Sequence, residues 1–259
     1  IKNRNLRFKT NKNLSQILEG KKILKISRKS KYLIIHFAQN NYLIIHFGMS
    51  GTLHLVKKNN LNRTNLSFYS SRDLPKKHNH VTIIFNNFKL IYNDPRRFGF
   101  FKFFKSKKLI LDYLSNLGPE PIEKKFNLIY LKKKFCNKKK NIKNILLDQK
   151  YVSGIGNIYA NEILYCAKIN PFNKGKNLTD KDILKIISCS KDIILKAIKK
   201  GGSTIRNFKN SKGKKGSFQD NFKVYNRANK KCFSKKCKGK ILKFFASNRS
   251  TFFCKYCQK

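Results

Sequence analysis

The chain has 259 residues, of which 60 are Lys or Arg and 12 are Asp or Glu, so its formal charge is +48. With 40% hydrophobic residues gathered in separate blocks it is long enough to bury a core, which excludes a purely disordered basic tail. No stretch reaches the roughly 18 apolar residues that a membrane span needs, and no apolar leader follows Ile1. We therefore expect a soluble protein of the reducing cytosol, without a membrane partner.

The charge excess favours a polyanionic partner, because each Lys or Arg placed on a phosphate releases condensed counterions. Only ten of the sixty basic residues are Arg, while Asn, Ile and Phe are abundant, so a good part of the Lys excess reflects AT-rich codon usage. The charge thus indicates nucleic acid as the class of partner. The chemistry has to come from specific residues.

The first half of the chain alternates short β-rich runs with turns. Such a series of short strands predicts an antiparallel β-sandwich or a barrel. The polar stretch 57–77 has no clear periodicity, and we expect it to form a long exposed loop. The predicted strands are residues 32–38, 42–47, 52–56, 81–85, 88–92 and 100–104.

A domain boundary is predicted at LGPEP, which begins at Leu117 and holds two prolines and a glycine. After it the apolar period becomes helical. A helix is predicted over 179–200, with Thr179 as N-cap, Asp182 at N3 and Gly201 at C′.

A second helix is predicted over 157–167. The chain enters it through the tight Gly154 to Gly156 turn, which follows a helical segment at 142–150. Two helices that meet at a glycine turn suggest a helix-turn-helix arrangement. The predicted domains are 1–120, 121–228 and 229–259.

Four cysteines near the C-terminus form two close pairs, with spacings x4 and x2, which can place four thiolates tetrahedrally around one Zn²⁺. The residues between the pairs predict a β-hairpin with Arg249 at its tip, and hence a zinc ribbon. The predicted ligands are Cys232, Cys237, Cys254 and Cys257. The other three cysteines have no such grouping and are predicted to be packing residues: Cys136, Cys166 and Cys189.

Six motifs in one fixed order resemble bacterial formamidopyrimidine-DNA glycosylase over essentially the whole chain. They are HFGMSG from His46, KHNH from Lys77, DPRRFG from Asp94, LGPEP from Leu117, GIGNIYA from Gly154 and the cysteine set. The resemblance implies an α+β fold, with an N-terminal antiparallel β-sandwich and a C-terminal helix-two-turn-helix domain that carries a zinc-ribbon hairpin. It also implies a monomer that binds damaged double-stranded DNA, removes oxidised purines and cuts the abasic strand by β,δ-elimination.

The resemblance assigns a wedge to three residues. A glycosylase takes its base out of the stack, and side chains must fill the hole that is left. By resemblance Met49 and Phe98 supply apolar contact there, and Arg96 hydrogen-bonds the orphaned pyrimidine. Met49 is the only methionine in the chain and lies in a Gly-Met-Ser-Gly turn, where burial in a core is less natural.

Other residues are assigned by resemblance to the DNA backbone, to the base pocket or to the reaction. Lys31 matches the proton donor of β-elimination, and Arg249 matches the arginine that grips the flanking phosphates and serves δ-elimination. The base pocket takes Lys143 and Lys214. The phosphate contacts are His46, His78, Lys138, Asn157 and Tyr225.

The sequence departs from the family pattern in two ways. The family begins with Pro-Glu-Leu-Pro-Glu, whose proline amine attacks the sugar as a secondary amine, and this chain as given begins with Ile1 instead. We expect an N-terminally incomplete form of a working enzyme, or else a decayed product that only binds DNA. The first cysteine pair is spaced x4, where the family usually has x2, and thiolates at that spacing still reach one metal.

Two alternatives stay open. The endonuclease VIII-like glycosylases share the architecture and prefer oxidised pyrimidines, but the Arg97-Phe98-Gly99 and LGPEP matches argue against them. A non-catalytic nucleic-acid-binding protein would explain the charge and the cysteines. It would leave the wedge set without a purpose.

Overall fold

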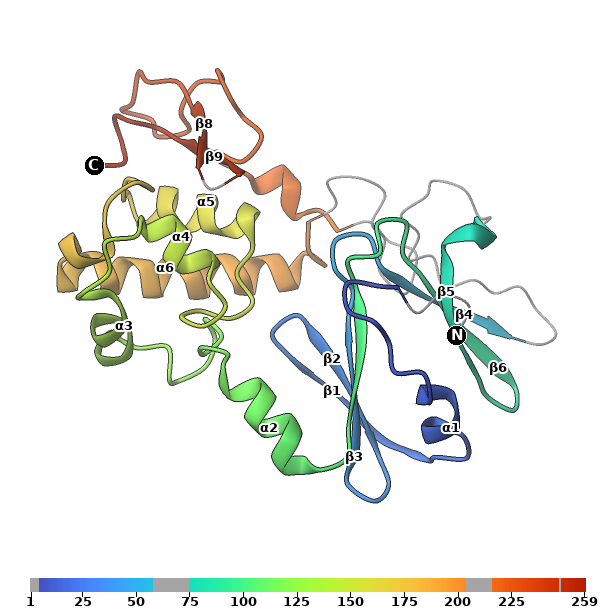
Figure 1. Ribbon diagram of the computed structural model, residues 1–259. Coiled ribbons are helices and arrows are strands. Elements are labelled where there is room, and N and C mark those ends of the chain that lie inside the picture. The colour runs from blue at the N-terminus through green and yellow to red at the C-terminus, as the bar shows by residue number, and fades with distance from the viewer. Residues whose placement is uncertain (1–4, 58–74, 204–215, 247) are drawn as a thin grey trace. The chain divides into compact units, whose positions relative to one another are not determined.

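The computed structural model describes residues 5–57, 75–203, 216–246 and 248–259. These residues divide into two compact units, one made of the residues up to Leu114 together with Ser203 and Gly216, and the other made of 115–202 and 217–259 (Figure 1). The cysteine-rich hairpin belongs to the second unit. Each unit has a hydrophobic core of its own.

The N-terminal unit contains two antiparallel sheets, which confirms the predicted β-sandwich. The first sheet has the strand order β1-β2-β3-β7, and the second has the order β4-β6-β5. The elements are α1 (Leu14–Leu18), β1 (Ile23–Lys29), β2 (Tyr32–Phe37), β3 (Asn41–His46), β4 (Thr52–Lys57), β5 (Asn79–Ile84), β6 (Phe88–Asn93), β7 (Phe100–Phe104) and α2 (Lys107–Ser115).

The four-stranded sheet is covered on both faces, which explains why β3 reads as an unbroken apolar run. Leu43 and Ile45 pack in one cluster with Tyr92 of the three-stranded sheet. On the opposite face, Ile44 packs in a second cluster with Ile110 of α2. The ends of β3 and β7 are therefore held from two sides, and the loops that leave them start from a rigid base.

Three elements of this unit were not predicted, the short helix α1, strand β1 and helix α2. In β1, Leu24 and Ile26 stay exposed and alternate with polar residues, so the strand lacks a clear apolar face. Helix α2 buries Ile110 but exposes Leu109 and Leu111, and nine residues are too few to show a helical period. Most of the loop predicted at 57–77 lies outside the described residues.

The C-terminal unit is helical with one hairpin. The predicted long helix is confirmed as α6, because the Thr179 hydroxyl accepts from the Asp182 backbone N–H while the Asp182 carboxylate accepts from that of Thr179. Gly201 follows the helix with φ of +70°. The elements are α3 (Leu128–Phe135), α4 (Ile142–Leu147), α5 (Asn157–Cys166), α6 (Asp180–Lys199), β8 (Leu242–Ala246) and β9 (Arg249–Phe253).

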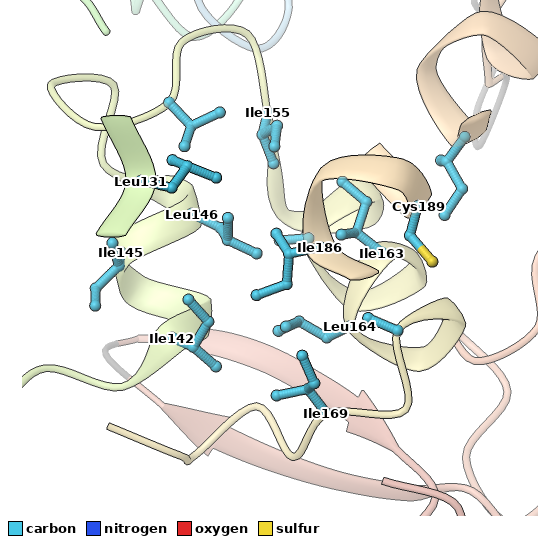
Figure 2. Packing of buried hydrophobic residues seen from close by; sticks show 14 of the residues in the cluster. Leu131, Ile142, Ile145, Leu146, Ile155, Ile163, Leu164, Ile169, Ile186 and Cys189 are labelled. Carbon is cyan, nitrogen blue, oxygen red and sulfur yellow. The ribbon is translucent and has the colours of Figure 1, made fainter. Parts of the chain in front are cut away.

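Helices α4, α5 and α6 turn their apolar faces toward one another and form the core of this unit (Figure 2). The core includes Ile142, Ile145, Leu146, Ile163, Leu164 and Ile186, all nearly or fully buried. The prediction that Cys166 and Cys189 serve only as packing residues is wrong, because a disulfide joins them. It links the end of α5 to the middle of α6, and only the way these two helices pack brings the sulfurs together. In the described parts of the chain, no helix is long and apolar enough to cross a membrane.

Candidate nucleic-acid interface and metal centre

Lys31 lies at the tip of the hairpin that joins β1 to β2. Lys29 pairs with Tyr32, so Ser30 and Lys31 alone make the turn, and Ser30 adopts a φ of +54°. The Arg28 guanidinium donates a 2.7 Å hydrogen bond to the Ser30 carbonyl. The turn therefore presents the exposed Lys31 side chain from a short, fixed tip.

His46 ends β3 and is half-buried. Its ring stacks on Phe100 at 5.3 Å between centroids, and its Nδ1 accepts a 3.1 Å hydrogen bond from the Gly48 N–H. Burial, and then the charges of Arg7 and Lys31, lower the pKa of His46 to about 4. At neutral pH the ring is uncharged and its proton sits on Nε2, because Nδ1 is an acceptor. His46 can thus donate one neutral hydrogen bond.

The three predicted wedge residues come together at the surface of the N-terminal unit, from two different loops. Met49 lies between β3 and β4, and Arg96 and Phe98 lie between β6 and β7. The Arg96 guanidinium carbon is 4.6 Å from the centre of the Phe98 ring, and its Nη1 is 3.9 Å from Met49 Sδ. Met49 is 63% exposed and Phe98 is 42% exposed. Two apolar side chains thus stand in water beside a guanidinium.

Glycines let the two wedge loops touch through their backbones. Gly48 has a φ of +63°, and a Cβ there would lie 2.5 Å from the carbonyl carbon of Phe98. A Cβ on Gly99 would collide with the Tyr92 hydroxyl. Any larger residue at Gly48 or Gly99 would force the loops apart.

His78 ends a short 3₁₀ turn, Lys76–His78, immediately before β5. Slight burial and then the charges of Lys77, His80 and Arg97 lower the pKa of His78, while Asp94 opposes them. The His78 carbonyl accepts a 3.0 Å hydrogen bond from the Asp94 N–H. His78 thus lies in the same unit as the wedge loops and is tied to one of them.

In the C-terminal unit, side chains of α4 and α5 hold strand β9, which lies against α5 (Figure 1). The Asn157 amide donates to the Ser250 carbonyl at 3.1 Å, and the Phe252 N–H donates to Asn161 Oδ1 at 2.8 Å. The exposed Arg249 is the first residue of β9. The helical core therefore sets where this arginine stands. Sequence reasoning missed Asn161, although a polar residue in an apolar helix was its signal.

Lys143 lies beneath β9 and is only 2% exposed. Its ammonium donates 2.8 Å hydrogen bonds to the Ser250 carbonyl and to the Thr251 hydroxyl. Burial, followed by the nearby charge of Arg249, lowers the pKa of Lys143 to about 8. The ammonium of this lysine thus bonds the hairpin, through Ser250 and Thr251.

Glu162, next to Asn161 on α5, holds a different segment. Its carboxylate accepts hydrogen bonds from the backbone N–H groups of Lys223, Val224 and Tyr225, at 2.8 to 3.0 Å. Burial raises the pKa of Glu162, and these three donors oppose that effect. The Tyr225 ring packs against Phe252 at 5.1 Å. Tyr225 is therefore placed by α5 as well. Glu162 was also missed, and its signal was a charge within an otherwise apolar run.

The last two predicted site residues are Lys138 and Lys214. The Lys138 ammonium lies 5.4 Å from the centre of the Tyr151 ring, and its carbonyl accepts a hydrogen bond from the Lys176 N–H. Lys138 thus belongs to a fixed turn after α3. Lys214 lies outside the described residues.

The four cysteines of the C-terminal pairs converge, with all four sulfurs within 4.8 Å of one another. The Sγ atoms of Cys232 and Cys257 are 3.7 Å apart, and those of Cys237 and Cys254 are 3.6 Å apart. Tetrahedral Zn²⁺ with Zn–S bonds of about 2.3 Å requires sulfur separations of about 3.8 Å. The cluster therefore fits a zinc ion, and the x4 spacing is accommodated.

Comparison with known proteins agrees with these features. The N-terminal domain model of formamidopyrimidine-DNA glycosylase matches residues 1–101, and its H2TH domain model matches residues 117–209. A formamidopyrimidine-DNA glycosylase of Rickettsia bellii is 43% identical over 260 residues, covering 100% of this chain and 90% of the relative. The chain belongs to the formamidopyrimidine-DNA glycosylase family. Another member, from Rickettsia conorii, is 40% identical and is covered to 89%.

Solved structures of the formamidopyrimidine-DNA glycosylase family superpose closely. The Lactococcus lactis Fpg in complex with DNA containing an abasic site has a TM-score of 0.82 and 34% identity, covering 95% of this chain and 86% of that one. MutM in complex with DNA containing carbocyclic 8-oxo-G gives the same TM-score and identity, with 95% and 85% covered. The likeness extends over both units of the fold.

Proposed function

We propose that this chain removes oxidised purines, such as 8-oxoguanine and formamidopyrimidines, from duplex DNA and cuts the abasic strand by β,δ-elimination. The observation that carries the proposal is the meeting of Met49, Arg96 and Phe98 at one exposed point of a formamidopyrimidine-DNA glycosylase fold. The reported relatives are formamidopyrimidine-DNA glycosylases, and MutM is in complex with DNA containing carbocyclic 8-oxo-G, which favours oxidised purines over oxidised pyrimidines.

The wedge replaces the stacking that an extruded base gives up. Met49 and Phe98 enter the gap with apolar atoms, and Arg96 donates to the orphaned pyrimidine. Unstacking a base costs a few kcal/mol, and one aromatic stacking contact returns about 1–3 kcal/mol. Arg96 lies over the Phe98 ring before DNA binds, so little side-chain freedom is lost on insertion.

The proposed contacts with the DNA backbone are of two kinds, made by charged side chains and by neutral ones. Arg249 grips the phosphates beside the lesion with its planar fork and assists δ-elimination. Lys138 adds a second positive charge. The other proposed backbone contacts are neutral hydrogen-bond donors. They are His46, through its Nε2 proton, His78, Asn157 and Tyr225.

The proton transfers belong to Lys31, whose hairpin tip presents an ammonium that can donate to the departing sugar oxygen in β-elimination. Lys143 and Lys214 are assigned to the base pocket. The two hydrogen bonds that Lys143 donates to β9 support a role in placing Arg249 as well.

The four-cysteine cluster would hold one structural Zn²⁺, which when bound cross-links the loops around β8 and β9. The distances between the sulfurs support this assignment. We further propose that the protein acts as a monomer in the bacterial cytoplasm, where its DNA substrate lies.

The test uses a labelled duplex with 8-oxoguanine opposite cytosine. A form extended upstream of Ile1 by the N-terminal residues of a relative, so that it begins with the family's Pro-Glu-Leu-Pro-Glu, should nick this strand and form a covalent adduct that borohydride traps. The 259-residue chain is the matched control and should give no adduct, because it does not carry the proline amine that is the family's nucleophile. Binding without any nick by the longer form would leave the non-catalytic alternative in place.

A further inference from the structure

Asp94 is a carboxylate with no exposed surface, at the end of β6. Its Oδ2 accepts hydrogen bonds from the Tyr92 hydroxyl at 3.0 Å and from the Gly99 N–H at 2.9 Å. Its Oδ1 accepts from the Ser50 hydroxyl and, at 3.3 Å, from the Arg96 N–H. All four donors point at one acceptor group, and a carboxylate has room for that many.

The donors come from both wedge loops. Ser50 follows Met49 in the loop between β3 and β4, while the Arg96 and Gly99 amides belong to the loop that carries Phe98. The Ser50 hydroxyl oxygen also accepts a 3.2 Å hydrogen bond from the Arg96 backbone N–H, so Ser50 bridges the loops directly. One side chain thus joins two segments that are 44 residues apart in the chain.

The main chain of Asp94 is fixed as well. Its N–H donates to the His78 carbonyl at 3.0 Å, and its carbonyl lies 2.9 Å from the Nε2 of the buried His80. The same carbonyl accepts from the Arg97 N–H at 3.2 Å, which closes a turn. The carboxylate is therefore anchored to strand β5 on one side and holds the loops on the other.

We infer that Asp94 is the positioning residue of the wedge. Its carboxylate clamps the two loops together so that Met49, Arg96 and Phe98 face the DNA as one preformed unit. The inference rests on the proposed function. Groups held in place before binding lose less freedom on binding, so the clamp strengthens recognition of an extruded site without touching DNA itself.

The variant Asp94→Asn tests the clamp because it keeps size and shape. The amide replaces one acceptor oxygen with an NH₂ donor. Whichever way the amide turns, its NH₂ meets a backbone N–H, either of Gly99 or of Arg96, and a backbone N–H cannot become an acceptor. In either case the loop that carries Arg96 and Phe98 loses one of its two backbone hydrogen bonds to residue 94, and its hold on the loop of Met49 and Ser50 weakens.

The experiment measures binding of the 259-residue chain to two duplexes of one sequence. The first carries a tetrahydrofuran abasic analogue opposite cytosine, and the second is undamaged. We expect Asp94→Asn to lose at least tenfold of the preference for the abasic duplex. Affinity for the undamaged duplex should change by less than twofold, because that binding comes from phosphate contacts.

Two controls separate positioning from general destabilisation. Ile35→Ala opens the core of the same unit and should lower the melting temperature while the preference stays within twofold of the unmodified chain. Ser50→Ala removes one donor to the carboxylate and should lose about threefold of the preference, which tests the clamp even if Asp94→Asn does not fold.

A combined variant gives the sharpest outcome. With Met49→Ala and Phe98→Ala already present, adding Asp94→Asn should cost no further preference, because the clamp acts only through the wedge. A full additional loss would overturn the inference, as would an Asp94→Asn protein that is folded and keeps its preference. An unmodified chain that binds both duplexes equally would overturn the proposed function and the clamp together.

Discussion

The His46→Gln variant tests the electrostatics at the end of β3, where we propose that His46 contacts a DNA phosphate. Burial, followed by the charges of Arg7 and Lys31, lowers the pKa of His46 from its usual 6.5 to about 4. Each pKa unit corresponds to about 1.4 kcal/mol of difference between the two protonation states. Because the ring is only partly buried, solvent screens its charge, and we expect about half of the free energy that the pKa shift would give in full. This contribution to the stability of the folded state is roughly 1.5–2 kcal/mol.

The sign follows from proton binding. Between pH 4 and 6.5 the unfolded chain binds a proton on His46 and the folded chain does not, so the stability of the folded state rises with pH through this window. Acidification from pH 7 to pH 4 should therefore destabilise the N-terminal unit by that 1.5–2 kcal/mol more than it destabilises the His46→Gln variant.

The assay is an NMR titration of the five histidine rings, combined with urea unfolding at pH 4.5, 5.5, 6.5 and 7.5. The ring resonance that disappears in His46→Gln should titrate near pH 4 in the unmodified chain. DNA affinity should keep the same salt dependence in the variant, because no charge is removed at neutral pH. A pKa of 6 or more for this ring, or equal pH dependence in both proteins, would refute the reasoning.

Four further outcomes are expected. Arg249→Gln should weaken binding to all duplexes and reduce the slope of log affinity against log salt by about 0.9, while Arg249→Lys keeps the slope. Replacing Cys166 and Cys189 together by Ala should lower the free energy of unfolding of the C-terminal unit by about 3 kcal/mol, because a loop of some two dozen residues is no longer closed in the unfolded chain. Calorimetry measures this loss. A reductant that spares zinc should lower the melting temperature of the unmodified chain and leave that of the variant unchanged. Glu162→Ala strands three backbone N–H groups and should cost about 3 kcal/mol or more in urea unfolding, with weaker binding of duplex DNA through Tyr225. Metal analysis of freshly purified protein should find one zinc per chain, and less than one in any single Cys→Ser variant of the cluster; a cluster that holds no zinc would contradict the assignment.

Local patterns in the sequence predict the parts of the fold that local forces determine. Helix α6 carries its own start signal in Thr179 and Asp182, and its end signal in Gly201, so its limits could be placed within a residue or two. The middle of strand β3, residues 42–45, is an apolar run because both faces of its sheet are covered. By contrast, β1 and α2 owe their form to neighbours, and their short mixed sequences predict little on their own.

The same distinction applies to the candidate site. Met49, Arg96 and Phe98 could be predicted because they lie within short sequence motifs that match the family in order along the chain. The role of Asp94, which holds them and reaches Ser50 across 44 positions, was missed. The disulfide of the C-terminal unit was missed as well, because its cysteines are brought together only by how two helices pack. No spacing rule foresees such contacts, since they depend on the finished arrangement of strands and helices.

Asn161 and Glu162 are neighbours on α5, yet they face different directions because successive residues on a helix are about 100° apart. Asn161 holds the strand that begins with Arg249, and Glu162 holds the segment that ends with Tyr225. A shift of this one helix would therefore displace both the strand that begins with Arg249 and the segment that ends with Tyr225. Changes in the helical core could therefore retune the grip on DNA without any substitution at a residue that touches it.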